Sequence, residues 1–359
     1  MKIRSLILVS ALLLASVESG RAQNNWQPTF KRGVNITDWV VNGSVTTRQE
    51  DLEWIARHGY DHVRLPFDAT RVLGPNGRLK AETLRPVDLL LQWAKKSRLG
   101  IVLDCHQFEG ANFLPRALDE RLFTDPKLQE KHANLWRQIA ERYRSEGAHL
   151  RFDLLNEAVT SDSEAVNLLM ERAVRAVRRV SSARVLYVTG NNWSQFRFAR
   201  YIKVHDDPNI IYVFHYYEPL IFTHQGTTYT EIGEKYKKPV KFPTYLNDLD
   251  KYFSRGVEGQ DLLRFNRIPL DCSFVESEFR ILAQWAREKK VKVAINEFGV
   301  FEAAPKDSAA RWMACVRAEC DRYGFDWAVW EYRGGFGVRG ADGNPTAIHR
   351  GLWSGKRGQ

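Results

Sequence analysis

The 359-residue sequence lacks any linker rich in proline, glycine or serine, and it contains no internal repeat. Length alone allows one barrel domain or two ordinary domains, and without a linker a single domain is the simpler interpretation. Beyond the first residues the sequence also lacks a second long apolar run. We therefore expect the mature protein to be soluble.

Cysteine is scarce, and the four that are present do not form a metal-binding pattern. There is no CxxC pair and no zinc-finger spacing among Cys105, Cys272, Cys315 and Cys320. Cys315 and Cys320 lie five positions apart on a predicted helix, so they point to different faces and should not bridge each other. The other pairings stay open.

The N-terminus has the pattern of a secretory signal peptide. Lys2 and Arg4 precede an apolar run over residues 6–15, and small and polar residues follow, with a candidate cleavage site at 20–22. The alternative is an uncleaved anchor, but the run is short for a membrane span. We predict a signal peptide over residues 1–22, a mature domain over 23–359, and a secreted or periplasmic location.

The formal net charge of +10 comes from basic residues that are scattered among acidic ones. Such scattering is typical of solvated helix faces, so we do not expect nucleic-acid binding. The positive charge is also compatible with adhesion to acidic cell-wall material.

Short apolar runs alternate with helix-like segments along the chain. Helix boundaries are indicated by capping boxes that start at Thr47, Ser161 and Ser273, by Asp125 before a proline, and by stops such as Gly324. Most of the runs lack polar alternation, as in strands that are covered on both faces. The eight strand candidates are residues 32–36, 62–65, 101–105, 152–155, 185–189, 210–215, 293–296 and 327–331.

Eight repeats of strand and helix predict an α/β fold of the (β/α)8 TIM barrel type, as a single domain. The rival is an open doubly wound sheet, which the missing glycine-rich phosphate turn argues against. A long insertion, residues 218–271, follows the sixth strand. Its aromatic residues could form one side of a sugar groove or a small satellite core: Phe222, Tyr229, Tyr236, Phe242, Tyr245, Tyr252 and Phe253.

Two apolar strands end in the same dipeptide, Asn156-Glu157 and Asn296-Glu297, 140 positions apart. Burying a charge is costly unless it is paired or useful, and catalytic groups of such barrels lie at the carboxyl ends of the strands. One protonated and one ionised glutamate facing one cavity suit the cleavage of a glycosidic bond.

A wider set of strand-end residues resembles glycoside hydrolase family 5, the cellulase family within the clan of (β/α)8 retaining glycosidases. The set follows the family's order from Gly33 to Trp330, and each motif lies at a strand end. It comprises Arg64, His106, Asn156-Glu157, His215-x-Tyr217, Glu297-Phe298-Gly299 and Trp330.

The resemblance implies a role for each catalytic residue. Glu157 matches the acid/base and Glu297 the nucleophile, while Asn156 would bind the sugar 2-OH. Arg64 and Tyr217 would donate hydrogen bonds to the Glu297 carboxylate and keep it ionised. Retention of configuration implies carboxyl groups about 5–5.5 Å apart.

Further positions are implied around this pair. His106 and His215 would line the subsite of the reacting sugar, and Trp330 would form its stacking floor. Glu109 beside His106 offers metal-ligand types, but a third ligand is missing, so we expect no metal and no cofactor. Candidate outer-subsite residues, which could equally be structural, are Trp39, Asn112, Asn191, Asn192 and Trp193.

The sequence thus predicts a monomeric, secreted, retaining endo-β-1,4-glucanase that acts on a β-glucan. Residues 331–337 are less aromatic than in many relatives, and Glu109 is unusual near the sugar-binding face. Both departures bear on substrate choice. The alternatives are a mannanase, xyloglucanase or β-1,3-glucanase of the same fold, or a carbohydrate-binding barrel without catalysis, which the presence of both glutamates argues against.

Overall fold

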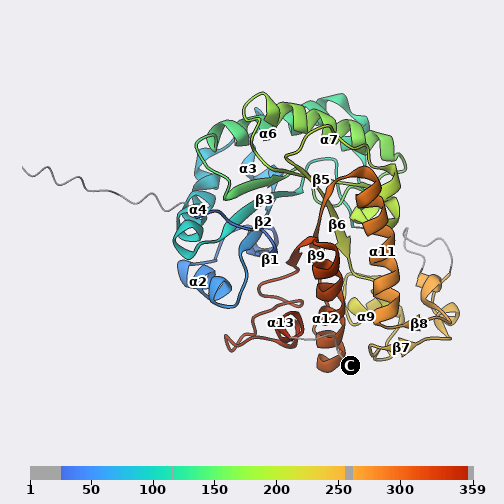
Figure 1. Cartoon of the computed structure of the whole chain (residues 1–359). Coiled ribbons are helices and arrows are strands. Elements are labelled where there is room, and N and C mark those ends of the chain that lie inside the picture. The colour runs from blue at the N-terminus through green and yellow to red at the C-terminus, as the bar shows by residue number, and fades with distance from the viewer. Residues whose placement is uncertain (1–25, 115–116, 255–261, 355–359) are drawn as a thin grey trace, which may run out of the picture.

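A closed barrel of parallel strands forms the centre of the molecule (Figure 1). The computed structural model describes residues 26–114, 117–254 and 262–354, so the predicted signal peptide lies outside the described residues. Within those ranges eight strands close the barrel in the order β1-β10-β9-β6-β5-β4-β3-β2. The predicted fold class is confirmed, with strands β1 (Arg32–Asn35), β2 (His62–Asp68), β3 (Gly100–Gln107), β4 (Leu150–Asp153), β5 (Leu186–Thr189), β6 (Ile210–Tyr216), β9 (Lys292–Phe298) and β10 (Asp326–Val329).

Apolar side chains fill the barrel interior and close its amino-terminal end. A small cluster of fully or nearly fully buried residues includes Phe30, Val102, Tyr187 and Val213, and the Arg151 guanidinium lies 3.6 Å from the centroid of the Phe30 ring. A separate, larger core lies between the strands and the helices. Because apolar side chains fill one end of the barrel, we look for polar functional groups at the other end, where the carboxyl ends of the strands lie.

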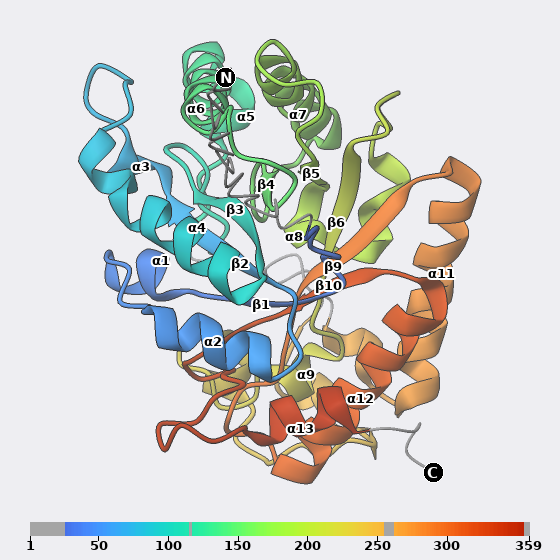
Figure 2. The same cartoon turned by 60° about the vertical axis from the view of Figure 1, so that its left-hand side comes forward.

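Helices surround the barrel, and Figure 2 shows α2 and α4 on the side near β1 and β2, with α13 beside α12. No helix in the described part of the chain is both long and apolar enough to cross a bilayer. The helices are α1 (Asp38–Asn42), α2 (Gln49–Arg57), α3 (Ala69–Val72), α4 (Arg85–Ser97), α5 (Arg121–Thr124), α6 (Pro126–Arg142), α7 (Ser163–Arg178), α8 (Asn191–Ser194), α9 (Leu220–Thr223), α10 (Glu231–Lys235), α11 (Cys272–Lys289), α12 (Lys306–Tyr323) and α13 (Ala347–Trp353).

The helix boundaries confirm part of the capping prediction. Asp125 caps α6 by accepting a hydrogen bond from the Lys127 amide at 2.8 Å, and Gly324 ends α12 at a φ of 70°. The predicted caps at Ser161 and Ser273 are wrong, because the neighbouring aspartates Asp162 and Asp271 accept the amide hydrogen bonds instead. A carboxylate is a stronger acceptor than a hydroxyl at this positive end of the helix dipole.

The capping box predicted at Thr47 is also displaced by one residue. Helix α2 has Arg48 as its N-cap, and the Asp51 carboxylate accepts from the Arg48 amide at 3.0 Å. The predicted partner, Glu50, lies one position before the residue that makes the contact. Aspartate reaches back across the first turn as glutamate does in the usual box.

The insertion after β6 is mainly a satellite core. It contains α9, α10 and a short antiparallel pair, β7 (Thr244–Tyr245) and β8 (Pro269–Leu270). The rings of Phe222, Phe242 and Phe253 are buried, whereas Tyr229 is half exposed. The structural alternative therefore accounts for most of the aromatic residues, and Tyr229 is the one that also lines the cavity described below.

A disulfide bond between Cys272 and Cys315 joins the start of α11 to α12. Cys105 and Cys320 are buried free thiols, so the predicted absence of a Cys315–Cys320 bridge is confirmed. The bond links positions 43 residues apart, across the two helices that flank β9 in the chain.

Replacing Cys272 and Cys315 by serine together should lower the free energy of unfolding by about 2–4 kcal/mol, because the unfolded chain regains the freedom of the closed loop. Urea denaturation of the oxidised protein measures the change. A reductant should destabilise the natural protein similarly and leave the double variant unaffected. Equal urea midpoints for the two proteins would contradict a stabilising bond.

Candidate active site

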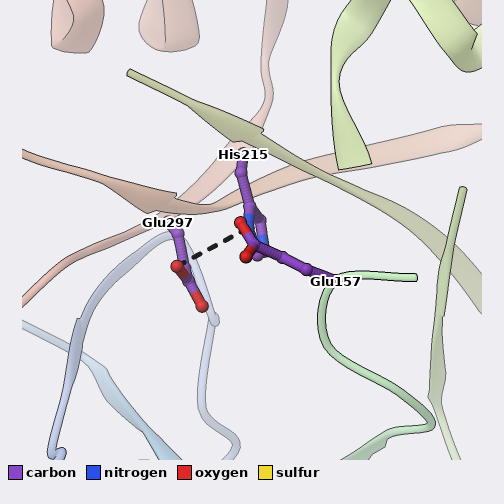
Figure 3. Close-up of side chains that lie close together, drawn as sticks. All are labelled: Glu157, His215 and Glu297. Carbon is purple, nitrogen blue, oxygen red and sulfur yellow. Dashed lines mark hydrogen bonds and ion pairs between the residues drawn. The ribbon is translucent and has the colours of Figure 1, made fainter. Parts of the chain in front are cut away.

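Two glutamates face each other at the carboxyl ends of the barrel strands (Figure 3). Glu157 follows β4, Glu297 lies in β9, and His215 from β6 is placed between them. One carboxyl oxygen of each glutamate and a ring nitrogen of His215 all lie within 4.8 Å of one another. His215 Nδ1 is 2.8 Å from Glu157 Oε1 and 3.5 Å from Glu297 Oε2. The structure thus brings together the two glutamates that lie far apart in the sequence.

Arg64 is the central cation of the site and is almost completely buried. Its Nη1 donates to Glu297 Oε1 at 2.6 Å and to Asn35 Oδ1 at 3.0 Å, and its Nη2 donates to Asn156 Oδ1 at 2.8 Å. A guanidinium holds several donors in one rigid plane, so one side chain fixes three neighbours at once.

Two buried aspartates lie on the other side of the guanidinium. Arg64 Nε donates to Asp153 Oδ2 at 2.9 Å, and Nη2 lies 3.0 Å from Asp104 Oδ2. Asp104 also contacts His106 Nδ1 at 2.8 Å, and Asn296 donates to Asp153 at 2.7 Å. Burial raises the pKa of Asp104 and of Asp153. One guanidinium cannot compensate three buried carboxylates, so the aspartates hold protons more readily than usual.

The two glutamates have different surroundings. Burial raises the pKa of Glu157 to about 7, although His106 and Arg64 act in the opposite direction. Glu297 receives hydrogen bonds on both oxygens, from Arg64 on Oε1 and from the Tyr217 hydroxyl on Oε2 at 3.2 Å. Donors on both oxygens therefore fix the orientation of the Glu297 side chain, whereas burial favours the protonated form of Glu157.

The histidines of the site are neutral near pH 7. Burial lowers the pKa of His215 to about 3 and that of His106 to about 4. Each imidazole consequently keeps one N–H donor and one acceptor nitrogen. They contribute hydrogen bonds and shape to the site without adding charge.

Trp330 lies beside His106, with ring centroids 5.3 Å apart and planes within 15°. Gly299 permits this placement, because a Cβ there would lie 2.3 Å from the Trp330 carbonyl oxygen. The next residue, Glu331, is buried and accepts a hydrogen bond from the Thr37 hydroxyl. Burial raises the pKa of Glu331 to about 7.

A cavity of about 160 Å³ opens beside Glu157. His215 and Tyr217 line it on the side of the two glutamates, and the insertion contributes Tyr229. Its remaining wall includes aromatic residues and a group of charged ones: Phe113, Trp193, Phe196, Arg197, Glu218 and Glu278.

One of the predicted outer-subsite residues lines this cavity. Trp193 lines it, and its indole Nε1 donates to the Phe113 carbonyl at 2.9 Å. Asn191 is buried, and its side chain exchanges hydrogen bonds with the backbone of Thr160 at 3.1 and 2.9 Å. Asn192 adopts a left-handed backbone conformation, with φ of 56°. The Asn191 amide thus serves local structure, since its polar atoms are already bonded to the chain.

The other predicted positions have structural contacts. Trp39 is buried, with its ring centroid 5.8 Å from that of Phe67. Asn112 Oδ1 accepts from the Leu114 amide at 3.0 Å. Glu109, which was considered as a metal ligand together with His106, forms an ion pair instead. Its Oε2 lies 2.6 Å from Lys131 Nζ.

Sequence reasoning missed the residues that support Arg64. Asp153 could have been found, because it is a charge inside an apolar strand and such a charge needs a partner. Nothing in the sequence indicates that Asn35 supports Arg64, because a single asparagine at a strand end can have many ordinary roles. It donates to the carbonyls of Asn296 and Val329 at 3.0 and 3.1 Å, across the seam between β9 and β10.

Glu157, His215 and Glu297 are also the described residues with the spacing of a metal site. Carboxylate oxygens and an imidazole nitrogen suit a zinc-like cation. Arg64 already places a positive charge 2.6 Å from Glu297, so a cation would meet repulsion there. We therefore assign no metal ion to these three groups.

A parallel barrel with two facing glutamates at its carboxyl-terminal mouth defines a glycoside hydrolase. The sequence matches the family description "Cellulase (glycosyl hydrolase family 5)" over residues 23–335. It is 32% identical to endoglucanase C of Acetivibrio thermocellus over 315 residues, 85% of this chain and 92% of that protein. It is equally similar to endoglucanase C307 of Clostridium sp., with the same coverage.

Solved structures show that the fold is shared. Subunit Z of the cellulose synthase of Clostridioides difficile matches with a TM-score of 0.73 and 26% identity, over 90% of this chain and 99% of that one. Cel5A of Thermotoga maritima, in complex with cellobiose, has the same TM-score at 24% identity over 90% and 97%. The chain belongs to glycosyl hydrolase family 5, the cellulase family.

Replacing Arg64 by lysine should lower the free energy of unfolding by about 3 kcal/mol, because one ammonium cannot bond all the groups that the guanidinium joins. Urea denaturation measures the loss. The matched control is Arg71→Lys, an exposed arginine 3.4 Å from Asp68, which should cost less than about 1 kcal/mol. Similar losses in the two variants would contradict a central role for Arg64.

Proposed function

We propose that this protein is an endo-acting β-1,4-glucanase that cleaves its substrate by double displacement and retains the anomeric configuration. The observation that carries the proposal is the pair Glu157 and Glu297, with carboxyl oxygens no more than 4.8 Å apart. That separation suits direct attack, whereas inverting enzymes need about 6.5–9.5 Å to hold a water. The 32% identity to endoglucanase C supports the substrate.

In the first step Glu297 attacks the anomeric carbon while Glu157 donates its proton to the leaving oxygen. The bond between the anomeric carbon and that oxygen breaks, and a glycosyl ester forms on Glu297. Arg64 and Tyr217 hold the Glu297 oxygens in place, which avoids reorganisation as the charge moves. Asn156, whose side-chain oxygen accepts a hydrogen bond from Arg64, binds the 2-OH of the reacting sugar in this proposal.

In the second step the ionised Glu157 takes a proton from water. The resulting hydroxide forms a bond to the anomeric carbon, and the ester to Glu297 breaks. His215, neutral and 2.8 Å from Glu157, orients that carboxyl in both steps. Trp330 and His106 form the surface on which the sugar ring rests, because sugar C–H faces pack against aromatic planes.

Variants of the two glutamates should separate their roles. Glu297→Gln should lower kcat on carboxymethylcellulose by about 10⁴-fold or more, because no ester can form. Glu157→Gln should lower it by about 10²–10⁴-fold, and less on an aryl β-cellobioside whose leaving group needs no proton. Azide should rescue Glu157→Ala and give the β-glycosyl azide.

The matched control is Glu109→Gln, an exposed glutamate near the same face, which should keep the activity of the natural protein. Release of reducing ends measures each variant. Activity that survives in Glu297→Gln would refute the nucleophile. A panel of cellulose, mannan, xyloglucan and β-1,3-glucan oligosaccharides tests the substrate, and preference for any but the first would refute the glucanase proposal.

The pH profile should follow Glu157. Its pKa is raised to about 7, and only its protonated form can donate to the leaving oxygen. We expect kcat/KM on cello-oligosaccharides to fall as pH rises through about 7. In Glu157→Gln, assayed on the activated aryl substrate, this alkaline limb should disappear. If the fall in kcat/KM persists at the same pH in this variant, it arises from the titration of a group other than Glu157.

Export of the protein and its monomeric state stay predictions. Export rests on the signal peptide predicted for residues 1–22, and N-terminal sequencing of the exported protein would test it. Light scattering of the purified protein would test the second.

A further inference from the structure

The cavity beside Glu157 carries an inference that rests on the proposed function. Its lining includes Glu157 but none of Glu297, Arg64 and Trp330. The acid/base must stand on the side of the leaving oxygen, because it donates a proton to that atom. A cavity that adjoins the acid and excludes the nucleophile therefore lies on the path of the leaving sugar chain.

Beyond Glu157 the cavity wall has the composition of a carbohydrate site. Aromatic rings of Phe113, Trp193 and Tyr229 offer flat apolar surfaces. Arg197 and Glu278 supply polar groups, and their side chains form an ion pair at 3.3 Å. Flat rings and planar charged side chains together match a sugar ring, which has apolar faces and a rim of hydroxyl groups.

Four elements bring the charged group together. Arg197 comes from a turn at η3 (Phe196–Tyr201), Glu218 follows β6, and Glu278 lies in α11. Arg264, from η5 (Leu262–Phe265) of the insertion, pairs with Glu218 and lies 3.7 Å from Glu278. Arg264 thereby ties the insertion to the barrel, whereas Arg197 and Glu278 face the cavity.

Hydrogen-bonding capacity remains in this group. The Arg264 Nη1 atom is buried without a hydrogen-bond partner, although its side chain is 15% exposed. Glu278 has one contact within hydrogen-bond distance, that of Arg197, and a carboxylate can accept about four. The Arg197 side chain is 48% exposed and keeps donors free. Hydroxyl groups can both donate to Glu278 and accept from Arg197.

We propose that this cavity binds the sugar on the leaving side of the cleaved bond, and that Arg197 and Glu278 are specificity-determining residues that bind its hydroxyl groups. Glu218 and Arg264 are positioning residues that hold the insertion, and with it Tyr229, over the cavity. Before the second step, a second sugar could occupy the same place as an acceptor. Its hydroxyl oxygen would then bond to the anomeric carbon, Glu157 would take its proton, and the ester to Glu297 would break.

The test compares two substrates that differ in the leaving group. When cellotetraose is cleaved, its leaving group is a sugar that occupies the cavity. When an activated aryl β-cellobioside is cleaved, the leaving group is a phenol, so no sugar occupies the cavity. In Glu278→Gln and Arg197→Gln the ratio of kcat/KM on cellotetraose to kcat/KM on the aryl substrate should fall about tenfold, as expected for one hydrogen bond to a charged group. Added cellobiose should also give fewer transfer products than with the natural protein.

The controls lie on the same elements outside the cavity. Glu276→Gln in α11 removes the 2.5 Å contact with Arg322, and Arg200→Gln lies in the same turn as Arg197; both should keep the natural ratio. An unchanged ratio in Glu278→Gln and Arg197→Gln would overturn the proposal. Equal losses on both substrates with a lower Tm would also overturn it, because they would indicate a purely structural pair. If the natural protein cleaves neither substrate, the proposed function itself fails.

Discussion

The site depends on one buried guanidinium. Arg64, in β2, contacts five side chains from four other strands, namely those of Asn35, Asp104, Asp153, Asn156 and Glu297. Strands β1 to β4 and β9 are thereby fixed relative to one another at the mouth of the barrel. A buried ion pair is weak evidence for stability, because desolvation offsets much of the attraction. Its value here is geometric, since the orientation of Glu297 follows from the plane of Arg64.

The difference between the two glutamates follows from this arrangement. Arg64 lies 2.6 Å from Glu297, while the first neighbour of Glu157 is a neutral imidazole. Burial therefore acts on Glu157 without a directly bonded cation, and its pKa rises to about 7. Two identical side chains within 4.8 Å of each other thus have different partners, a guanidinium for Glu297 and an imidazole for Glu157.

The fold was predictable because its signals are local and repeated. Each of the eight predicted strands is present, since runs such as residues 101–105 have too few polar residues for any exposed element. The helix starts were less predictable: at Ser161 and Ser273 a neighbouring aspartate competes for the same amides. One-residue choices of this kind depend on small free-energy differences between acceptors.

The site was predictable only in part, for a related reason. Glu157 follows an apolar strand and Glu297 lies near the end of another, and a carboxylate in such a position needs an explanation from the sequence alone. The cluster of Arg197, Glu218, Glu278 and Arg264 could not be foreseen, because its members come from four elements and two of them lie on surface-like helical turns. Their proximity depends on how the insertion folds back onto the barrel, which no local pattern encodes.

Strand β6 and the residue after it connect the two glutamates to the insertion, because successive side chains point to opposite sides. His215 and Tyr217 point to the two glutamates, whereas Tyr216 packs against Trp312 of α12, with ring centroids 5.9 Å apart. The Trp312 indole also donates to the Glu218 carbonyl at 3.0 Å, so the point where the insertion begins is anchored to the same helix. A helix that the disulfide ties to α11 therefore holds both the strand that orients Glu157 and the segment that carries Tyr229. Because both rest on one support, a displacement of α12 would move the groups beside Glu157 and the segment that carries Tyr229 together.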